Sequence, residues 1–189
     1  MLLFVGLGNP GPRYAETPHN AGFVVCDRFA ARHRFPAPSE KYRGVFTRGR
    51  VGTHDVGLLK PQTFMNLSGR SVAEALRFHK LSVEDTIVIH DDLDIPFGRV
   101  KLKEVGGHAG HNGLRSLAQE LSSGAFVRVR VGIGRPLHGD VVNYVLNNFT
   151  PEEMSGLPRL LDGVIDLLEL LISEGLPKTM SLYNNKELL

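Results

Sequence analysis

The sequence predicts one α/β domain in which helices cover both faces of a β-sheet. Short apolar runs alternate along the chain with longer segments whose apolar residues recur every three or four positions, as strands and helices do. The chain has 189 residues, of which 42% are hydrophobic and one is cysteine. A domain of this size buries a core without disulfides or a multi-cysteine zinc site. We therefore expect a single domain over residues 1–189.

Composition and charge exclude several other classes of protein. Charged residues make up 22% of the chain, so disorder is not expected. No apolar run approaches the ~20 residues of a membrane span, and the N-terminus has no basic leader, so we expect a cytoplasmic protein without a membrane partner. Residues 1–80 contain 12 Lys and Arg against 5 Asp and Glu, whereas residues 141–189 contain 3 against 7. This asymmetry is compatible with a polyanionic partner and also with ordinary scatter of surface charge.

The first 34 residues predict a strand, a tight turn and a helix. An apolar run at residues 2–7 is typical of a buried strand. The following Gly8-Asn9-Pro10-Gly11 has proline and glycine in the order of a type II turn. Thr17 and Pro18 predict the N-cap and the first position of a helix that extends to near residue 34.

The rest of the chain alternates between strands and helices. Apolar patterns predict further strands at 43–60 (two strands of a hairpin), 87–89, 99–104 and 127–133. Helical periodicity predicts helices at 66–79, 111–121 and 151–174, the last with a capping box at Thr150-Pro151-Glu152-Glu153 and a stop at Gly175. Ligands of such sheets bind beyond the carboxyl ends of the strands. Asn9, residues 60–66 and Asp91 follow predicted strands, so we expect them to border one crevice.

Gly6-Leu7-Gly8-Asn9-Pro10-Gly11 matches the pattern G-x-G-x-x-G of dinucleotide-binding sites. We reject a nucleotide-binding oxidoreductase for three reasons. Pro10 removes a backbone amide that such a site needs, the helix begins too late, and no acidic residue ends a second parallel strand at the usual spacing. The alternative is a tight turn in which Asn9 bonds its own backbone.

His19 has the chemistry of a general base. It lies in the first turn of the predicted helix, whose dipole disfavours the charged imidazole, and a nearby carboxylate would orient the ring. A neutral, oriented imidazole activates water. The local sequence equally allows a surface histidine near a helix end.

An acidic cluster, Asp91, Asp92 and Asp94, lies at the end of the strand at 87–89. Such a cluster can bind Mg²⁺, but no companion cluster supplies further oxygen ligands. We favour one orienting carboxylate together with loop-capping residues. A solvated acidic loop is the remaining alternative.

Residues 106–113, Gly-Gly-His-Ala-Gly-His-Asn-Gly, are the least generic segment of the chain. This density of glycine costs conformational entropy and is typical of backbone that moves or closely approaches a ligand. The helix predicted behind it can receive an anion or a developing oxyanion. His108 and His111 lack a third convergent ligand, so we do not predict a zinc site.

Four basic residues lie on two predicted strands at a spacing of two: Lys101, Lys103, Arg128 and Arg130. Each pair therefore projects from one face of the sheet. This arrangement suits contacts with phosphate groups, although a solvated sheet face has the same pattern. Aromatic residues make up 7% and tryptophan is absent, so we expect recognition of phosphates and shape rather than base stacking.

Five segments carry recognisable signatures in collinear order over nearly the whole chain. They are Gly6-Leu7-Gly8-Asn9-Pro10-Gly11 with Tyr14 and His19-Asn20-Ala21-Gly22, residues 60–69, His90-Asp91-Asp92-Leu93-Asp94, residues 106–114, and residues 128–136. Together these segments resemble the bacterial peptidyl-tRNA hydrolases. The resemblance implies a monomer with a mixed β-sheet sandwiched between helices. It also implies hydrolysis of the ester that joins a peptide to the 3′-terminal ribose of tRNA.

The resemblance implies a role for each candidate residue. The pair that activates water is His19 and Asp91. The residues that hold the peptide and the 3′-terminal nucleotide are Asn9, Asn66 and Asn112, with Tyr14 and His111 lining the same cleft. The clamp on the 5′-phosphate of the tRNA is Lys103 and Arg130, with Lys101 and Arg128 beside it. No metal or organic cofactor is implied.

We therefore expect an enzyme that recycles peptidyl-tRNA. An ester is more reactive than an amide, so a water held by histidine and aspartate suffices without a covalent nucleophile. No serine lies in a nucleophile-elbow pattern. The alternative is a catalytically idle RNA-binding relative, since some family members in plant organelles are splicing cofactors. A lost histidine or a transit peptide would favour it, and the sequence shows neither.

Overall fold

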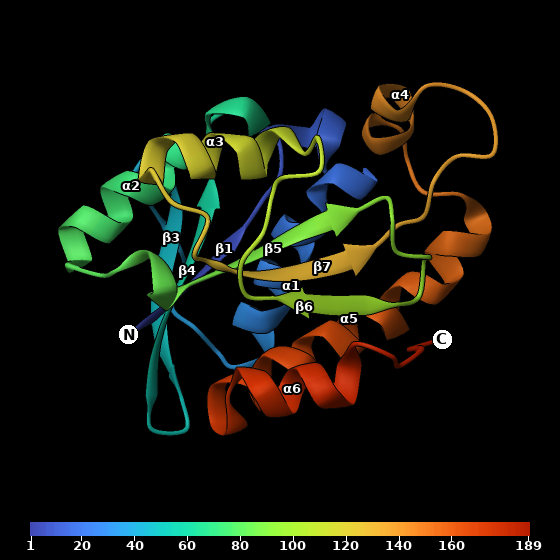
Figure 1. The fold of residues 1–189 in the computed structure, drawn as a ribbon. Helices are drawn as coiled ribbons and strands as arrows, with labels where there is room; N and C mark the ends of the chain where they lie inside the picture. Colours follow the sequence, from blue (N-terminus) through green and yellow to red (C-terminus); the bar gives the residue numbers. More distant parts are fainter.

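A seven-stranded mixed sheet forms the centre of the molecule in the computed structural model, which describes all residues, 1–189 (Figure 1). The strands are β1 (Leu2–Gly6), β2 (Ser39–Lys41), β3 (Gly44–Val51), β4 (His54–Pro61), β5 (Thr86–Asp92), β6 (Val100–Lys103) and β7 (Val127–Gly132). Their order across the sheet is β2-β3-β4-β1-β5-β7-β6. The four central strands, β4, β1, β5 and β7, are parallel, and the outer strands are antiparallel to their neighbours.

Helices cover both faces of the sheet, which confirms the predicted α/β class (Figure 1). On one face lie α2 (Ser68–His79) and α3 (Asn112–Leu121), and on the other lie α1 (Ala21–Arg32), α5 (Pro151–Glu174) and α6 (Leu176–Tyr183). The short α4 (Val141–Leu146) stands apart from both layers, near the ends of β5 and β7. None of the helices combines the length and the apolar character needed to cross a membrane.

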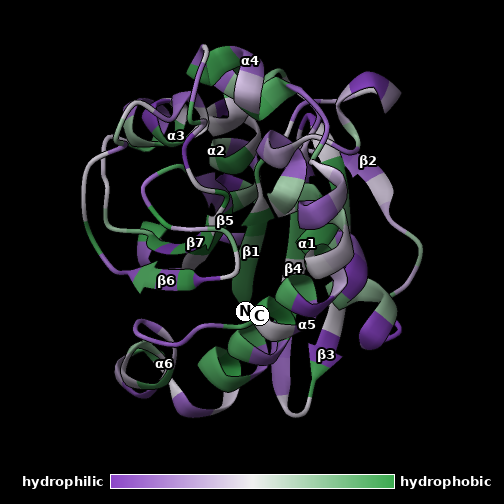
Figure 2. Cartoon of the chain, turned by 90° about the vertical axis from the view of Figure 1, so that its right-hand side faces the viewer, coloured by the Kyte–Doolittle hydropathy of each residue, from purple (hydrophilic) through white to green (hydrophobic).

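Buried side chains fill both interfaces between the sheet and its helices. Phe4 of β1 packs into the cluster that includes α1 and α5, whereas Leu3 and Val5 pack into the cluster of α2 and α3. Because β1 is covered on both faces, its apolar residues do not alternate with polar ones, and the strand is hydrophobic along its length (Figure 2). The apolar run that begins the sequence is therefore the central strand.

Of two local predictions near the N-terminus, the type II turn is wrong and the helix start at Thr17 is confirmed in position only. Gly11 has a positive φ of 101°, as expected, but its ψ of 154° is not that of a type II turn. The residue that would close this turn is Pro12, which has no N–H to donate. Thr17 and Pro18 are the N-cap and the first position of a helix, as predicted, but this helix is a 3₁₀ helix, Pro18–Asn20, and α1 begins only at Ala21. The Thr17 side chain makes no capping bond, because its hydroxyl donates to the carbonyl of Tyr14.

Candidate functional site

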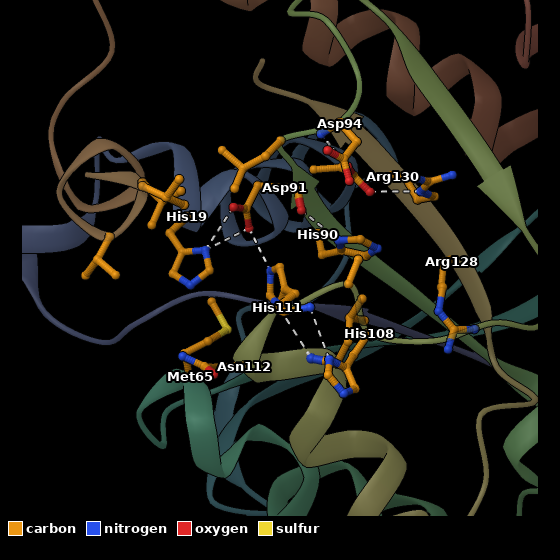
Figure 3. A pocket seen from close by; sticks show the side chains of 18 of the residues that line it. His19, Met65, His90, Asp91, Asp94, His108, His111, Asn112, Arg128 and Arg130 are labelled. Carbon is orange, nitrogen blue, oxygen red and sulfur yellow. Dashed lines mark hydrogen bonds and ion pairs between the residues drawn. The ribbon is translucent and has the colours of Figure 1, made fainter. Parts of the chain in front are cut away.

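A cavity of about 460 Å³ opens beyond the carboxyl ends of the parallel strands (Figure 3). The chain reaches it after β1 at Asn9, after β4 at Met65 and Asn66, and at the end of β5 at Asp91. The sequence-predicted residues that line it are Asn9, His19, Asn66, Asp91, Lys103, His111, Asn112, Arg128 and Arg130. Tyr14 and Lys101 are not among the lining residues. The predicted crevice thus exists at the expected edge of the sheet.

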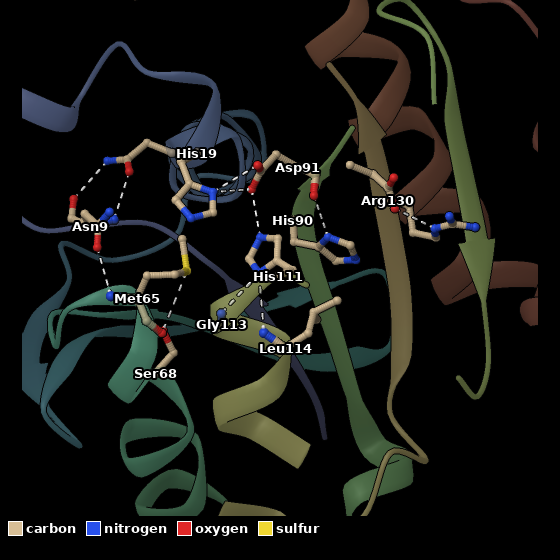
Figure 4. Close-up of polar contacts among 12 residues, drawn as sticks. Asn9, His19, Met65, Ser68, His90, Asp91, His111, Gly113, Leu114 and Arg130 are labelled. Carbon is tan, nitrogen blue, oxygen red and sulfur yellow. Dashed lines mark hydrogen bonds and ion pairs between the residues drawn. The ribbon is translucent and has the colours of Figure 1, made fainter. Parts of the chain in front are cut away.

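The carboxylate of Asp91 joins two histidines that come from distant parts of the chain (Figure 4). Nδ1 of His19 lies 2.9 Å from both carboxylate oxygens, and Nε2 of His111 lies 2.9 Å from Oδ1. Only 3% of the Asp91 side chain is exposed. Burial by itself raises the pKa of Asp91, but the two neighbouring imidazoles outweigh it and hold this pKa far below its usual range. The carboxylate is therefore ionised.

Hydrogen bonds assign the protons on the two rings. Nδ1 of His111 accepts the backbone N–H groups of Gly113 and Leu114 at the start of α3, so its proton lies on Nε2 and is donated to Asp91. An ionised carboxylate only accepts, so Nδ1 of His19 also carries a proton. Nε2 of His19 then carries a lone pair and has no partner in the protein, and the ring lines the cavity. This atom has the geometry of a general base.

A second network holds the segment that precedes His19. Asn20 accepts the backbone N–H of Asn9 at 2.8 Å and donates to the carbonyl of Asn9 at 2.9 Å. The side-chain oxygen of Asn9 accepts the N–H of Met65 at 2.8 Å, which leaves its NH₂ group for the cavity. Asn20 was not singled out from the sequence, although it lies within a signature segment. Its pairing with a residue eleven positions away has no signature in local periodicity.

Two further asparagines present unbonded amides to the cavity. Asn66 lies in the 3₁₀ helix Met65–Leu67 and Asn112 is the first residue of α3. Both are exposed, and neither side chain has a hydrogen-bond partner in the protein. An amide donates and accepts, so these groups can bind both the carbonyl and the N–H of a peptide unit.

The four basic residues lie on one face of the sheet, because Lys101 is directly opposite Arg130 and Lys103 is opposite Arg128. They differ in what they contact. Arg130 donates from Nε to Asp92 at 2.9 Å, and Lys103 is exposed without an ion pair. Arg128 is 2% exposed, and its guanidinium is bonded to backbone carbonyls. Lys101 and Lys103 both lack an ion pair, and of these two only Lys103 lines the cavity, where it is free to bind an anion.

His90 is a third histidine beside Asp91, and it is buried. Its Nδ1 donates to the backbone carbonyl of Asp91 at 2.8 Å, and its Nε2 has no partner. Burial, followed by the neighbouring His111, lowers the pKa of His90 to about 3. The ring is therefore neutral at physiological pH.

Apolar side chains that the sequence did not single out complete the cavity wall. Phe64 and Val142 each expose 59% of their surface, and both line the cavity together with Met65 and Val145. Phe64 precedes a 3₁₀ turn and Val142 belongs to the six-residue α4. Neither element is long enough for a hydrophobic pattern to reveal which side faces the site.

The only group of side chains with metal-ligand spacing is His19, Asp91 and His111, whose ligand atoms lie within 4.8 Å of one another. A metal on Nε2 of His111 would displace its proton to Nδ1. That nitrogen already accepts two N–H groups of α3. The three donors therefore fit a metal only if the start of α3 rearranges.

Comparisons with known proteins place this cavity in context. A family model described as peptidyl-tRNA hydrolase matches residues 3–188. The peptidyl-tRNA hydrolase of Geotalea uraniireducens is 74% identical over 99% of this chain and 98% of that protein. That of Geobacter sulfurreducens is 68% identical over 99% and 97%. The crystal structure of peptidyl-tRNA hydrolase from Acinetobacter baumannii is 38% identical, covers 100% and 97%, and superposes with a TM-score of 0.90.

Proposed function

Because the chain belongs to the peptidyl-tRNA hydrolase family, we propose that it cleaves peptidyl-tRNA with a water molecule that His19 activates. The resemblance seen in the five sequence segments is confirmed, and hydrolysis of peptidyl-tRNA is the activity of this enzyme family. The observation that carries the mechanism is the buried, ionised Asp91, which holds Nδ1 of His19 and leaves Nε2 on the cavity.

The reaction is a hydrolysis of the ester between the peptide and the 3′-terminal ribose. Nε2 of His19 takes a proton from water, and the water oxygen attacks the carbonyl carbon of the ester. The bond to the ribose oxygen then breaks, and the imidazolium returns the proton to that oxygen. Asp91 stabilises the imidazolium while it exists, as a buried carboxylate does in hydrolytic triads.

Peptide and terminal nucleotide would be held by Asn9, Asn66 and Asn112, with His111 in the same cavity wall, whereas Tyr14 lies outside the lining. The contact with Met65 engages the amide oxygen of Asn9, so its NH₂ group is oriented to donate to a substrate carbonyl. Amide contacts with a peptide backbone do not depend on side chains. We therefore expect hydrolysis of peptidyl-tRNAs whose peptides differ widely in sequence.

The 5′-phosphate of the tRNA would bind between Lys103 and Arg130, with Lys101 as an outer candidate, whereas the buried guanidinium of Arg128 is already bonded to backbone carbonyls. Asp92 compensates part of the charge of Arg130, so Lys103 is the member of this pair whose charge has no partner in the protein. Binding through phosphates releases counterions and should weaken with salt. We propose that no metal or organic cofactor takes part, since both imidazoles already donate to Asp91 in the arrangement that the base requires.

The direct test is hydrolysis of an N-acetylaminoacyl-tRNA. We expect His19→Ala to lower kcat by about 10²–10⁴-fold, the contribution of a general base. His54→Ala, an exposed histidine at the opposite end of the sheet, should retain full activity. Activity should also survive a chelator.

Three outcomes would contradict this proposal. An inactive wild-type protein that still binds tRNA would favour the idle RNA-binding relative. Loss of activity with chelator would restore a metal role for the acidic residues. Full activity of His19→Ala would remove this histidine from the mechanism.

A further inference from the structure

We propose that Arg128 and Gly106 are positioning residues that aim the ammonium group of Lys103 into the cleft. This inference rests on the proposed function, in which Lys103 binds the 5′-phosphate. It assigns Arg128 an action through the protein rather than through contact with tRNA.

The guanidinium of Arg128 connects three points of the backbone. Nη1 donates to the carbonyls of Gly124 and Phe126, both at 3.0 Å, and Nη2 donates to the carbonyl of Gly106 at 2.6 Å. Its central carbon lies 4.1 Å from the centre of the Phe126 ring, and no carboxylate pairs with it. Figure 3 shows Arg128 beyond His90 and His108 as seen from His19. The side chain thus ties β7 to the start of the glycine-rich loop.

Burial excludes Arg128 from direct contact with a phosphate in this arrangement. The residue is 2% exposed, and its Nε is buried without a partner. A phosphate would have to displace Gly106 or Gly124 from the guanidinium to reach it. The stacking on Phe126 further fixes the plane of the guanidinium.

Gly106 connects Arg128 to Lys103. Its carbonyl is held by Arg128, and the end of the Lys103 side chain lies against its Cα, where a Cβ would otherwise project. A Cβ added to Gly106 would lie 2.5 Å from Cε and 2.6 Å from Nζ of Lys103, which is closer than any real contact. The absence of a side chain at 106 therefore creates the surface on which the lysine rests.

This support matters because a lysine side chain is otherwise mobile. Fixing a lysine side chain costs up to ~2 kcal/mol of rotamer entropy. A lysine already held along Gly106 loses less of this freedom when it binds a phosphate, so binding is stronger. Lys103 is directly opposite Arg128 in the β6–β7 pairing, so one cross-strand pair and one glycine form the whole unit.

The test compares KM values for N-acetylaminoacyl-tRNA among matched variants. We expect Lys103→Ala to raise KM about tenfold, the value of one charge-assisted hydrogen bond, without changing kcat. Gly106→Ala should raise KM in the same direction because its methyl group displaces the lysine. Gly107→Ala is the matched comparison: Gly107 also lines the cavity, but its backbone φ is not positive and no atom lies within 4 Å of its added Cβ, so it does not displace the lysine and its KM should rise less.

Arg128 is tested with substitutions that keep or remove its charge, and with a double variant that also lacks Lys103. Arg128→Lys keeps the charge but cannot reach the carbonyls of Gly106 and Gly124 together, so it should raise KM as much as Arg128→Gln. In the Lys103→Ala background, Arg128→Lys should have no further effect, as residues of one unit are not additive. Hydrogen exchange of amides 104–111 should accelerate in both Arg128 variants.

The outcomes separate this inference from the proposed clamp. If Lys103→Ala leaves KM unchanged, the clamp itself is wrong. If Lys103→Ala raises KM while Gly106→Ala and Arg128→Lys do not, the clamp stands and the positioning role is wrong. An Arg128→Lys variant that binds tRNA as well as wild type, beside a weak Arg128→Gln, would make Arg128 a direct phosphate ligand.

Discussion

Three histidines surround Asp91, and what occupies their ring nitrogens decides what each can do. His111 has both nitrogens bonded within the protein, and His90 donates one to a backbone carbonyl while the other is buried. Only His19 combines a held Nδ1 with an Nε2 on the cavity. The same residue type therefore has the geometry of a general base at one position and is bonded within the protein or buried at the other two.

His90 should make the protein less stable in mild acid. Its folded pKa of about 3 lies below the ordinary value of 6.5, so the unfolded chain binds a proton that the folded chain does not. Stability therefore falls as pH drops from 6.5 toward 3, by at most about 1.4 kcal/mol per pH unit from this residue. We expect a shallower decline for His90→Asn, whose NH₂ can still donate to the carbonyl of Asp91.

Urea unfolding between pH 4.5 and 7.5 measures this difference. The window lies above the range in which Asp91 would be protonated, because its pKa is held low. His54→Asn, at an exposed position, is the matched control. Parallel pH curves for wild type and His90→Asn would show that burial of His90 does not determine the acid response.

At the level of elements, α3 is joined to the site by its own N-cap. Nδ1 of His111 accepts two N–H groups of the first turn while Nε2 donates to Asp91. Histidine is not among the preferred N-cap residues, whereas asparagine is. Histidine at this position therefore stabilises α3 less than asparagine would, but it also contacts the carboxylate of Asp91.

Two substitutions of His111 should separate these roles. His111→Ala removes both contacts and should lower the free energy of unfolding by about 1 kcal/mol, the value of a lost cap. His111→Asn keeps a cap oxygen but does not reach Asp91 in the same way, so we expect wild-type stability with reduced kcat. Chemical denaturation and steady-state kinetics on both variants measure this. Equal activity of wild type and His111→Asn would limit His111 to capping.

The sequence predicts the long elements well and the short ones poorly. Several predicted elements are confirmed: the hairpin of β3 and β4, the strands β5, β6 and β7, and the capping box of α5. They could be predicted because each has a clear apolar pattern or a clear cap. The sequence misses β2, with three exposed residues, the six-residue α4, and α6, which begins directly after Gly175. Such segments are set by neighbours in space, and a glycine that ends one helix does not reveal whether another begins beyond it.

The sequence likewise predicts the position of some residues of the candidate site and not of others. Residues at strand ends, such as Asn9 and Asp91, can be placed at one edge of the sheet from topology alone. The contacts of Asn20 and the burial of Arg128 cannot, because both depend on backbone carbonyls or amides brought together by tertiary structure. In the sequence, a basic residue on an alternating strand has the same pattern whether a phosphate or a backbone carbonyl accepts its hydrogen bonds.

At the scale of the whole molecule, the C-terminal tail protects the exposed edge of the sheet. The edge strand β6 has no strand partner on its outer side. The side chain of Asn184 accepts from the N–H of Leu102 at 2.7 Å and donates to its carbonyl at 3.2 Å. Further on, the N–H of Leu188 donates to the carbonyl of Gly98. These contacts satisfy groups that could otherwise pair with another chain.

Asn184→Ala should therefore weaken the edge and favour self-association. We expect wild type to be monomeric, and the variant to lose about 1–2 kcal/mol of stability through two unpaired backbone groups. Asn185→Ala, exposed and without such contacts, is the control. Light scattering over a range of concentrations and hydrogen exchange at Leu102 measure the two effects. A monomeric, equally stable Asn184→Ala would assign edge protection to the remaining tail.

The shared carboxylate of Asp91 also bears on the order in which the protein folds. It receives one imidazole from 72 residues before it and another from 20 residues after it. The first contact requires the parallel pairing of β1 with β5, which closes a long loop and is slow to form. A partly folded chain in which β1 and β5 are not yet paired therefore lacks an assembled site. Recovery of hydrolysis during refolding thus reports when β1 and β5 have paired. We expect it to occur later than the spectroscopic signal of helix formation.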